Sequence, residues 1–130
     1  MRPKNIPGGG SFIEITGSTD IPFEIKRVFY IYGSDSKDLV RGQHANRKSE
    51  FVLFNICGSC RVSVIDENRE AKVYVLDKPS EGLYLPRMVW KEMYDFSKNS
   101  VLMVLSSERY DPDEYIRDFE EYVQELHEME

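Results

Sequence analysis

The residues that could do chemistry gather in one short segment and in one pair further along the chain. In the segment from Arg41 to Glu50 these residues are Arg41, His44, Asn46 and Glu50, and the later pair is Trp90 and Lys91. Among these side chains, the imidazole of His44 is the one that titrates near neutral pH without help from its surroundings. The sequence therefore predicts proton transfer or ligand binding at His44, with a buried, hydrogen-bonded histidine as the alternative.

The spacing of these residues is similar to that of a metal-binding cupin whose ligands have been replaced. In such a site two histidines stand one residue apart on a strand, a glutamate follows, and a third histidine comes after a proline. Here the four places hold His44, Asn46, Glu50 and Lys91. A carboxamide is a poor ligand for divalent metals and a protonated lysine repels them, so we expect no bound metal and no cofactor. A weaker alternative is a metal site made by His44 and Glu50.

The length and charge of the chain limit what it can be. We expect residues 1–130 to form a single domain around one core. The net charge of −6 argues against a general nucleic-acid binder, because nonspecific affinity for a polyanion needs clustered lysine and arginine. Neither a signal peptide nor an apolar run of membrane-spanning length is recognisable. Cys57 and Cys60 are interpreted as reduced thiols beside a turn, and the expected location is the cytoplasm.

Short segments of strand-like composition recur along the chain, with turn residues between them. The predicted strands are 12–15, 25–32, 51–56, 60–65, 71–76, 82–85, 89–95 and 101–106. This spacing favours an all-β fold, an antiparallel sandwich or barrel of jelly-roll type. From Pro112 to Glu130 apolar residues recur every three or four positions, which predicts one amphipathic helix capped by Asp111 or Asp113.

Alternation along the strand that contains Arg27 divides its side chains between two faces. Arg27, Phe29 and Ile31 share one of them. An arginine on an otherwise apolar face is costly unless an anion meets it. Arg27 is therefore a candidate for binding an anionic ligand, and the alternative is an internal ion pair with Glu14 or Glu50.

Taken together, these residues make the chain resemble the sugar 3,4-ketoisomerases, metal-free cupins that act on dTDP-4-keto-6-deoxyhexoses. The likeness runs from about Phe12 to Tyr122, and its most specific strings are IPFEIKRVFY at 21–30, RGQHA at 41–45, GSCRV at 58–62, GLY at 82–84, VWKEMYDF at 89–96 and YDPDEYIR at 110–117. The resemblance implies a cupin jelly-roll barrel with a C-terminal α-helix, and an isomerase of deoxyamino-sugar biosynthesis for glycans such as lipopolysaccharide. It also implies a homodimer, in which the N-terminal strand at 12–15 pairs with an edge of the partner's sheet.

The same resemblance suggests roles for the candidate residues. The family moves a ketone from C4 to C3 of the hexose through an enediol, so a base must take the C3 proton. In the family pattern that base is the second histidine of the pair, whose place is held here by Asn46, and a carboxamide cannot accept a proton at physiological pH. Two hypotheses follow: an isomerase in which Lys91 or His44 has taken over proton transfer, or a catalytically impaired or engineered homologue that only binds the dTDP-sugar.

Four residues are candidates for contact with the substrate. Arg41 could bind the diphosphate with paired N–H groups, or be a surface arginine. Trp90 could form a wall against the sugar or fill the core. Arg27 and Phe29, which lie on the strand predicted at 25–32, complete the set of candidates.

Overall fold

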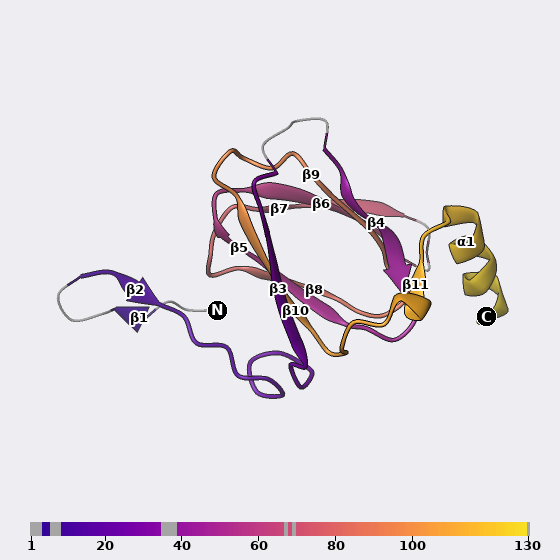
Figure 1. Cartoon of the computed structure of the whole chain (residues 1–130), viewed down its shortest axis with the longest axis horizontal. Coiled ribbons are helices and arrows are strands. Elements are labelled where there is room, and N and C mark those ends of the chain that lie inside the picture. The colour runs from indigo at the N-terminus through magenta and orange to yellow at the C-terminus, as the bar shows by residue number, and fades with distance from the viewer. Residues whose placement is uncertain (1–3, 6–8, 35–38, 67, 69, 130) are drawn as a thin grey trace.

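Two antiparallel sheets face each other across the main core of this chain (Figure 1). The computed structural model describes residues 4–5, 9–34, 39–66, 68 and 70–129. One sheet has the order β3 (Arg27–Tyr32), β10 (Val101–Ser106), β5 (Phe51–Cys57) and β8 (Gly82–Leu85). The other has the order β11 (Tyr115–Ile116), β4 (Arg41–Asn46), β9 (Trp90–Tyr94), β6 (Cys60–Ile65) and β7 (Ala71–Leu76). The predicted all-β cupin architecture is confirmed.

The core between the sheets follows from the two-residue period of the strands. Phe51 and Leu53 of β5 point between the sheets and meet Leu102 and Val104 of β10. The intervening residues of β5 are buried as well, because the segment that precedes β3 covers the outer face of this sheet. This second cluster contains Ile21, Phe23, Val52, Phe54 and Leu105. A strand covered on both sides explains the unbroken apolar run at the start of β5.

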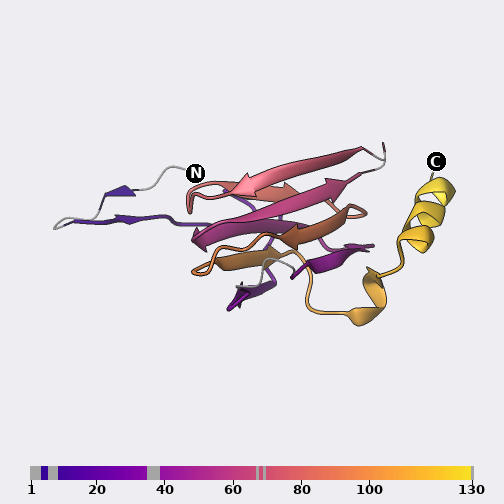
Figure 2. The ribbon, with the colours of Figure 1, turned by 90° about the horizontal axis from the view of Figure 1, so that it is seen from above.

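Most predicted strands agree with the structure, and the N-terminal one does not. The bounds of β6, β7, β8 and β10 are as predicted. Compared with the prediction, β5 is one residue longer, β9 is one residue shorter at each end, β3 begins two residues later, and β4 is an additional strand. The strand predicted at 12–15 is wrong in extent, since only β2 (Ser11–Phe12) is extended there and pairs with β1 (Lys4–Asn5). This small hairpin stands away from the barrel, at the opposite end of the molecule from the C-terminal helix (Figures 1 and 2).

The predicted C-terminal helix is confirmed, but its predicted start at Pro112 is wrong. The tail begins with a 3₁₀ turn, η1 (Pro112–Glu114), continues as β11 against β4, and only then forms α1 (Phe119–Glu128). Asp111 caps the 3₁₀ turn, while Asp118 caps α1 by accepting a hydrogen bond from the Glu120 backbone N–H. The helix then buries Tyr122 and Leu126 against the outer face of the second sheet.

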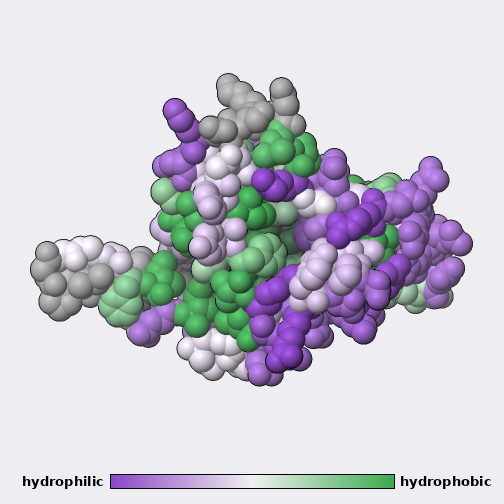
Figure 3. Space-filling model, viewed as in Figure 1, coloured by the Kyte–Doolittle hydropathy of each residue, from purple (hydrophilic) through white to green (hydrophobic). Residues whose placement is uncertain are grey.

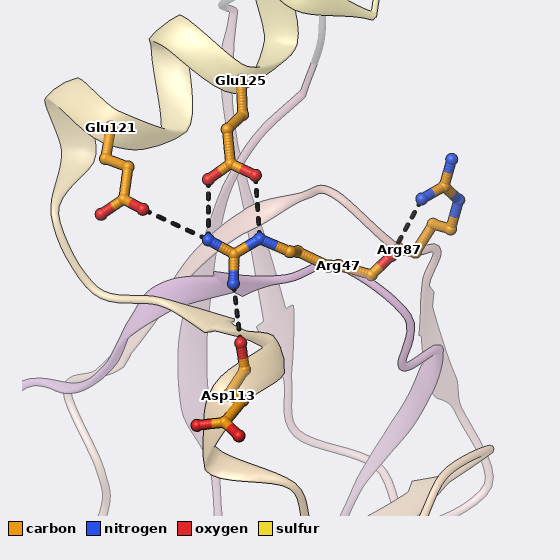
Figure 4. Close-up of polar contacts among 5 residues, drawn as sticks. All are labelled: Arg47, Arg87, Asp113, Glu121 and Glu125. Carbon is orange, nitrogen blue, oxygen red and sulfur yellow. Dashed lines mark hydrogen bonds and ion pairs between the residues drawn. The ribbon is translucent and has the colours of Figure 1, made fainter.

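Arg47, directly after β4, holds this tail in place (Figure 4). Its Nε and Nη2 donate to the two carboxylate oxygens of Glu125 at 2.8 and 2.9 Å, and Nη2 also reaches Glu121 at 3.2 Å. Its Nη1 donates to the backbone carbonyl of Asp113 at 2.8 Å. One planar guanidinium with several donors thus fixes both the helix and the 3₁₀ turn. The residues that follow Asp113 are thereby positioned beside β4.

Candidate active site

A cavity of about 200 Å³ opens between the two sheets. Its walls are mostly apolar and include four of the predicted site residues: Phe29, Arg41, His44 and Lys91. The remaining lining residues are Ile31, Gly42, Phe51, Leu53, Met93, Val104 and Tyr115. A few polar groups converging in an apolar cavity are typical of a ligand site.

The backbone of β4 is irregular where it meets the cavity. The register against β9 shifts between Gly42 and His44, and both Gly42 and Gln43 have positive φ angles, of 89° and 41°. This is a β-bulge, which re-aims the side chains that follow it. In a regular strand, residues 41 and 44 would point to opposite faces. The bulge instead lets Arg41 and His44 line the same cavity.

His44 is held in one tautomer. Its Nδ1 lies 2.5 Å from the backbone carbonyl oxygen of Gly42, which can only accept a hydrogen bond, so Nδ1 carries the proton and Nε2 keeps its lone pair. The ring also packs on Tyr115, with 4.7 Å between ring centroids. Burial, and next the charge of Lys91, lower the pKa of His44 from 6.5 to about 4. The imidazole is therefore neutral at pH 7.

Lys91 is a buried amine beside the cavity. It is 5% exposed, and its Nζ lies 4.7 Å from the centre of the Phe51 ring. Burial lowers the pKa of Lys91 from 10.5 to about 7, against the opposing effect of the Glu114 carboxylate. A substantial fraction of Lys91 is therefore neutral near pH 7, and neutral amine is the form that can accept a proton.

Asn46 lies behind Lys91 and is not among the residues that line the cavity. Its Oδ1 accepts a hydrogen bond from Lys91 Nζ at 2.9 Å, and its Nδ2 donates to Glu114 Oε1 at 2.5 Å. Glu114 was not predicted as a site residue, although it lies in the specific string at 110–117. No local pattern signals this contact, since 68 positions separate the two residues along the chain.

Arg27 lies at the edge of the cavity rather than in its wall. Its guanidinium packs over the rings of Phe29 and Tyr110 at 4.8 and 5.4 Å, and Nη2 donates to the hydroxyl of Tyr115 at 3.2 Å. Its Nε is buried and has no hydrogen-bond partner in the described part of the chain. Arg41, in the wall, donates from Nε to Ser34 Oγ at 3.0 Å. Both arginines thus keep N–H donors that an anion could use.

The placement of Trp90 corrects its prediction as a substrate contact. Trp90 is 5% exposed and packs edge-on against Phe119 and beside Tyr122, in the cluster under α1. Adjacent residues of a strand point to opposite faces, so Trp90 and Lys91 cannot both face the cavity. Of the two alternatives left by the sequence, the structure supports the core position.

Glu50 does not line the cavity with His44, and its Oε1 accepts a hydrogen bond from the hydroxyl of Tyr84. Among the described residues, no group of three or more histidine, cysteine, aspartate or glutamate side chains is arranged to hold a metal ion. The expectation that no metal binds stays a prediction. In the same part of the chain, no helix has the length and apolar character to cross a membrane.

Comparisons with known proteins fit this arrangement. The family described as FdtA: WxcM-like, C-terminal matches residues 4–127. The TDP-4-oxo-6-deoxy-alpha-D-glucose-3,4-oxoisomerase of Aneurinibacillus thermoaerophilus is 43% identical over 119 residues, 92% of this chain and 84% of that protein. The crystal structure of QdtA, a sugar 3,4-ketoisomerase of Thermoanaerobacterium thermosaccharolyticum in complex with TDP, is 39% identical, with a TM-score of 0.91 over 98% of this chain and 91% of that one.

A histidine-to-asparagine mutant of QdtA, in complex with TDP-4-keto-6-deoxyglucose, is similar at 38% identity, with a TM-score of 0.90 over 98% of this chain and 90% of that one. The match of a family over nearly the full chain, together with these identities, shows the relationship. This chain belongs to the FdtA, WxcM-like family.

Proposed function

We propose that this protein is a nucleotide-sugar 3,4-ketoisomerase that converts dTDP-4-keto-6-deoxyglucose, or a close relative of it, to the 3-keto sugar. The activities of its relatives support the reaction type. The observation that carries the proposal is Lys91, a buried amine whose pKa lies at about 7 and which lines the cavity. A general base works best when its pKa is close to the working pH.

The size of the cavity suits the sugar of the substrate but not its nucleotide. Its volume of about 200 Å³ is below the roughly 300–1,000 Å³ of pockets that enclose whole drug-sized ligands. A hexose ring fits such a space, and the nucleotide then lies outside it. Arg41 in the wall and Arg27 at the edge can meet the diphosphate with charge-assisted hydrogen bonds. Phe29, which lies in the wall, packs against the guanidinium of Arg27.

The reaction needs one proton to move between carbons and one between oxygens. The amine of Lys91 takes the proton from C3, the electron pair forms the C3–C4 double bond of the enediol, and the resulting ammonium returns a proton to C4. At the same time the C3 hydroxyl loses a proton and the C4 oxygen gains one. Nε2 of His44, unprotonated because Nδ1 faces the Gly42 carbonyl, can accept a hydrogen bond from the C3 hydroxyl. In this scheme His44 orients the sugar and Lys91 acts as the base.

A covalent route through Lys91 fails on chemical grounds. A desolvated lysine could form a Schiff base with the C4 ketone. After the proton shift, however, the nitrogen would remain on C4 as a secondary amine, and water could not release it. The 3-keto product carries a hydroxyl at C4, so Lys91 must act on protons alone.

A second candidate function is ligand binding without turnover. Asn46 favours it, because the carboxamide stands where the resemblance places the catalytic histidine. A relative with a histidine replaced by asparagine is recorded in complex with TDP-4-keto-6-deoxyglucose. Such a protein would share the cavity and the arginines with the enzyme and differ in the rate of proton abstraction.

Deuterium exchange at C3 separates these two functions. We expect NMR to show that the unmodified protein exchanges the C3 proton of dTDP-4-keto-6-deoxyglucose in D₂O. The Lys91→Met variant should exchange it about 10²–10⁴-fold more slowly. Lys78→Met is the matched control, since Lys78 is exposed and pairs with Glu81 on the surface at 3.7 Å. If the unmodified protein binds the sugar in calorimetry without exchanging C3, the isomerase proposal fails and the binding function stands.

We also propose that the protein is a cytoplasmic homodimer. Apolar side chains gather on the face that carries β3 and β10 (Figure 3), where Val28, Tyr30 and Tyr32 are 54%, 63% and 69% exposed. A partner subunit could cover this row, and the projecting β1–β2 hairpin could reach it. Cys57 and Cys60 are free thiols, which suits a reducing compartment.

A further inference from the structure

A buried carboxylate lies on the far side of Asn46 from the cavity. Glu114 is 3% exposed and belongs to the 3₁₀ turn at the start of the tail. Its Oε1 accepts hydrogen bonds from Asn46 Nδ2 and from the backbone N–H of Ser49, while Oε2 is buried without a partner in the described part of the chain. A buried carboxylate is costly unless its charge is compensated. Lys91, at the other end of the Asn46 side chain, is the cation that compensates this charge.

The carboxamide of Asn46 joins these two charged groups in one orientation. Lys91 Nζ is a donor and therefore requires the oxygen of Asn46, whereas the Glu114 carboxylate requires its NH₂ group. Reversing the amide would break both hydrogen bonds. The hydrogen bonds to Lys91 and to Glu114 thus fix the orientation of the Asn46 carboxamide between the amine and the carboxylate.

The turn that carries Glu114 is itself held in place. The backbone N–H of Arg47 donates to the Glu114 carbonyl oxygen at 2.9 Å, and Arg47 Nη1 holds the carbonyl of Asp113. Asp111 closes the turn by accepting from the Asp113 N–H. Glu114 therefore cannot move away from Asn46 without breaking the contacts that fasten the tail.

We propose that Glu114 is a positioning residue of the isomerase, which acts through Asn46 to orient Lys91 and to hold part of its positive charge without touching the sugar. This inference rests on the proposed function, in which Lys91 is the base. It also gives Asn46 a role, as the neutral link that keeps a direct ion pair from forming. A direct carboxylate contact would hold Lys91 as ammonium, which cannot accept a proton.

Other charged or titratable side chains line the cavity with Lys91. Arg41 and His44 from β4 and Tyr115 from β11 line the same cavity, and His44 is neutral at pH 7. Glu114 is the group whose charge raises the pKa of Lys91, in opposition to burial. On its other side, Glu114 borders a surface hollow of mixed charge, lined by the basic residues Lys26, Lys48 and Arg109 and the acidic residues Glu24, Glu108 and Asp111. Removing the carboxylate should therefore lower the pKa of Lys91 below about 7.

The test is the pH dependence of C3 exchange in Glu114→Gln. Glutamine keeps an oxygen for Asn46 and Ser49 and removes the charge. A unit charge one amide away, at an effective dielectric constant near 20, shifts a pKa by on the order of one unit. We expect the acidic limb of the rate profile to move down by about one pH unit, with little change in KM because Glu114 does not line the cavity. Glu114→Asp, which keeps the charge, should move the limb back towards that of the unmodified protein.

Glu108→Gln is the matched control, since Glu108 pairs with Lys26 on the surface at 3.6 Å and should leave the profile in place. A folded Glu114→Gln variant with an unshifted acidic limb would overturn the role of Glu114 while leaving Lys91 as the base. Unchanged exchange in Lys91→Met would instead overturn the proposed function.

If Glu114→Gln does not fold, NMR of the unmodified protein decides. The ¹³Cε resonance of Lys91 should titrate near pH 7, and the ¹³Cδ resonance of Glu114 should follow with the same midpoint. A Glu114 signal that does not respond to the titration of Lys91 would refute the coupling.

Discussion

Lys91 should lower the stability of the fold at neutral and acidic pH, and its replacement by methionine should reveal by how much. The fall in its pKa from 10.5 to about 7, at roughly 1.36 kcal/mol per unit, corresponds to about 5 kcal/mol of unfavourable free energy for the charged form in the folded protein. Methionine has a similar length and suits the apolar neighbours Phe51 and Met93. It leaves the oxygen of Asn46 without its donor, which costs about 1–3 kcal/mol.

The sign of the effect depends on pH. Below pH 7 the lysine is protonated in both the folded and the unfolded chain, so the full penalty is present. Between about pH 7 and 10.5 the unfolded chain binds more protons than the folded one, and the stability of the lysine form rises with pH. Lys91→Met should therefore stabilise the protein by about 2–4 kcal/mol at pH 6 and lose this advantage by pH 10.

Guanidinium chloride unfolding at pH 6, 8 and 10 measures this difference, with Lys78→Met as the control whose effect should not depend on pH. A stability difference between the lysine and methionine forms that stays the same at all three pH values would refute the shifted pKa. It would then also remove the main reason for assigning the base to Lys91. Stabilisation at pH 6 together with loss of C3 exchange would show a residue kept for function at a cost in stability.

Four further predictions concern the site and the assembly. Asn46→His should lower C3 exchange measured by NMR, because it removes the carboxamide that joins Lys91 to Glu114; a gain of about 10²–10⁴-fold would instead place the base at position 46, as the family resemblance implies. Arg41→Ala should weaken dTDP binding about ten-fold or more, since a charge-assisted hydrogen bond contributes roughly 1.5–3 kcal/mol; equal calorimetric affinities of the unmodified protein for dTDP and thymidine would contradict diphosphate recognition. Light scattering at micromolar protein should give the mass of a dimer, and a single-subunit mass would exclude it. Elemental analysis of protein purified without added metal should find no stoichiometric zinc, iron or manganese, and finding one would revive the metal site.

The strands could be predicted because their apolar runs and turn residues are local signals. The two-residue period also predicts that Phe29 and Ile31 share one face of β3, and both line the cavity. The same period was available to separate Trp90 from Lys91, and a strict application of it would have assigned Trp90 to the core. The start of the tail helix is predicted too early because Tyr115, in β11, falls in the helical period of the residues after it, while Asp118 caps the helix.

The site was predictable only in part. The resemblance singled out His44, Asn46 and Lys91; His44 and Lys91 line one cavity, and Asn46 lies behind Lys91. That Arg41 shares this cavity depends on the bulge at Gly42 and Gln43. Gly42 is the local signal for it, because a glycine inside a strand often marks a bulge. The shifted pKa values and the contact with Glu114 arise from burial and from a long-range meeting of chain segments. Neither the pKa shifts nor this contact can be predicted from local sequence patterns.

The order of the elements along the chain has a consequence for how activity appears during synthesis. All strands of both sheets except β11 precede the tail, so the barrel can close before residues 112–128 have left the ribosome. Tyr115 and Glu114, which line and support the site, arrive afterwards and are fastened by Arg47. A chain that stops after Ser106 would lack Tyr115 from the cavity wall, Glu114 beside Asn46, and the tail residues Ile116, Tyr122 and Leu126 that bury Trp90. The site and the packing of the second sheet therefore both depend on the last residues to be synthesised.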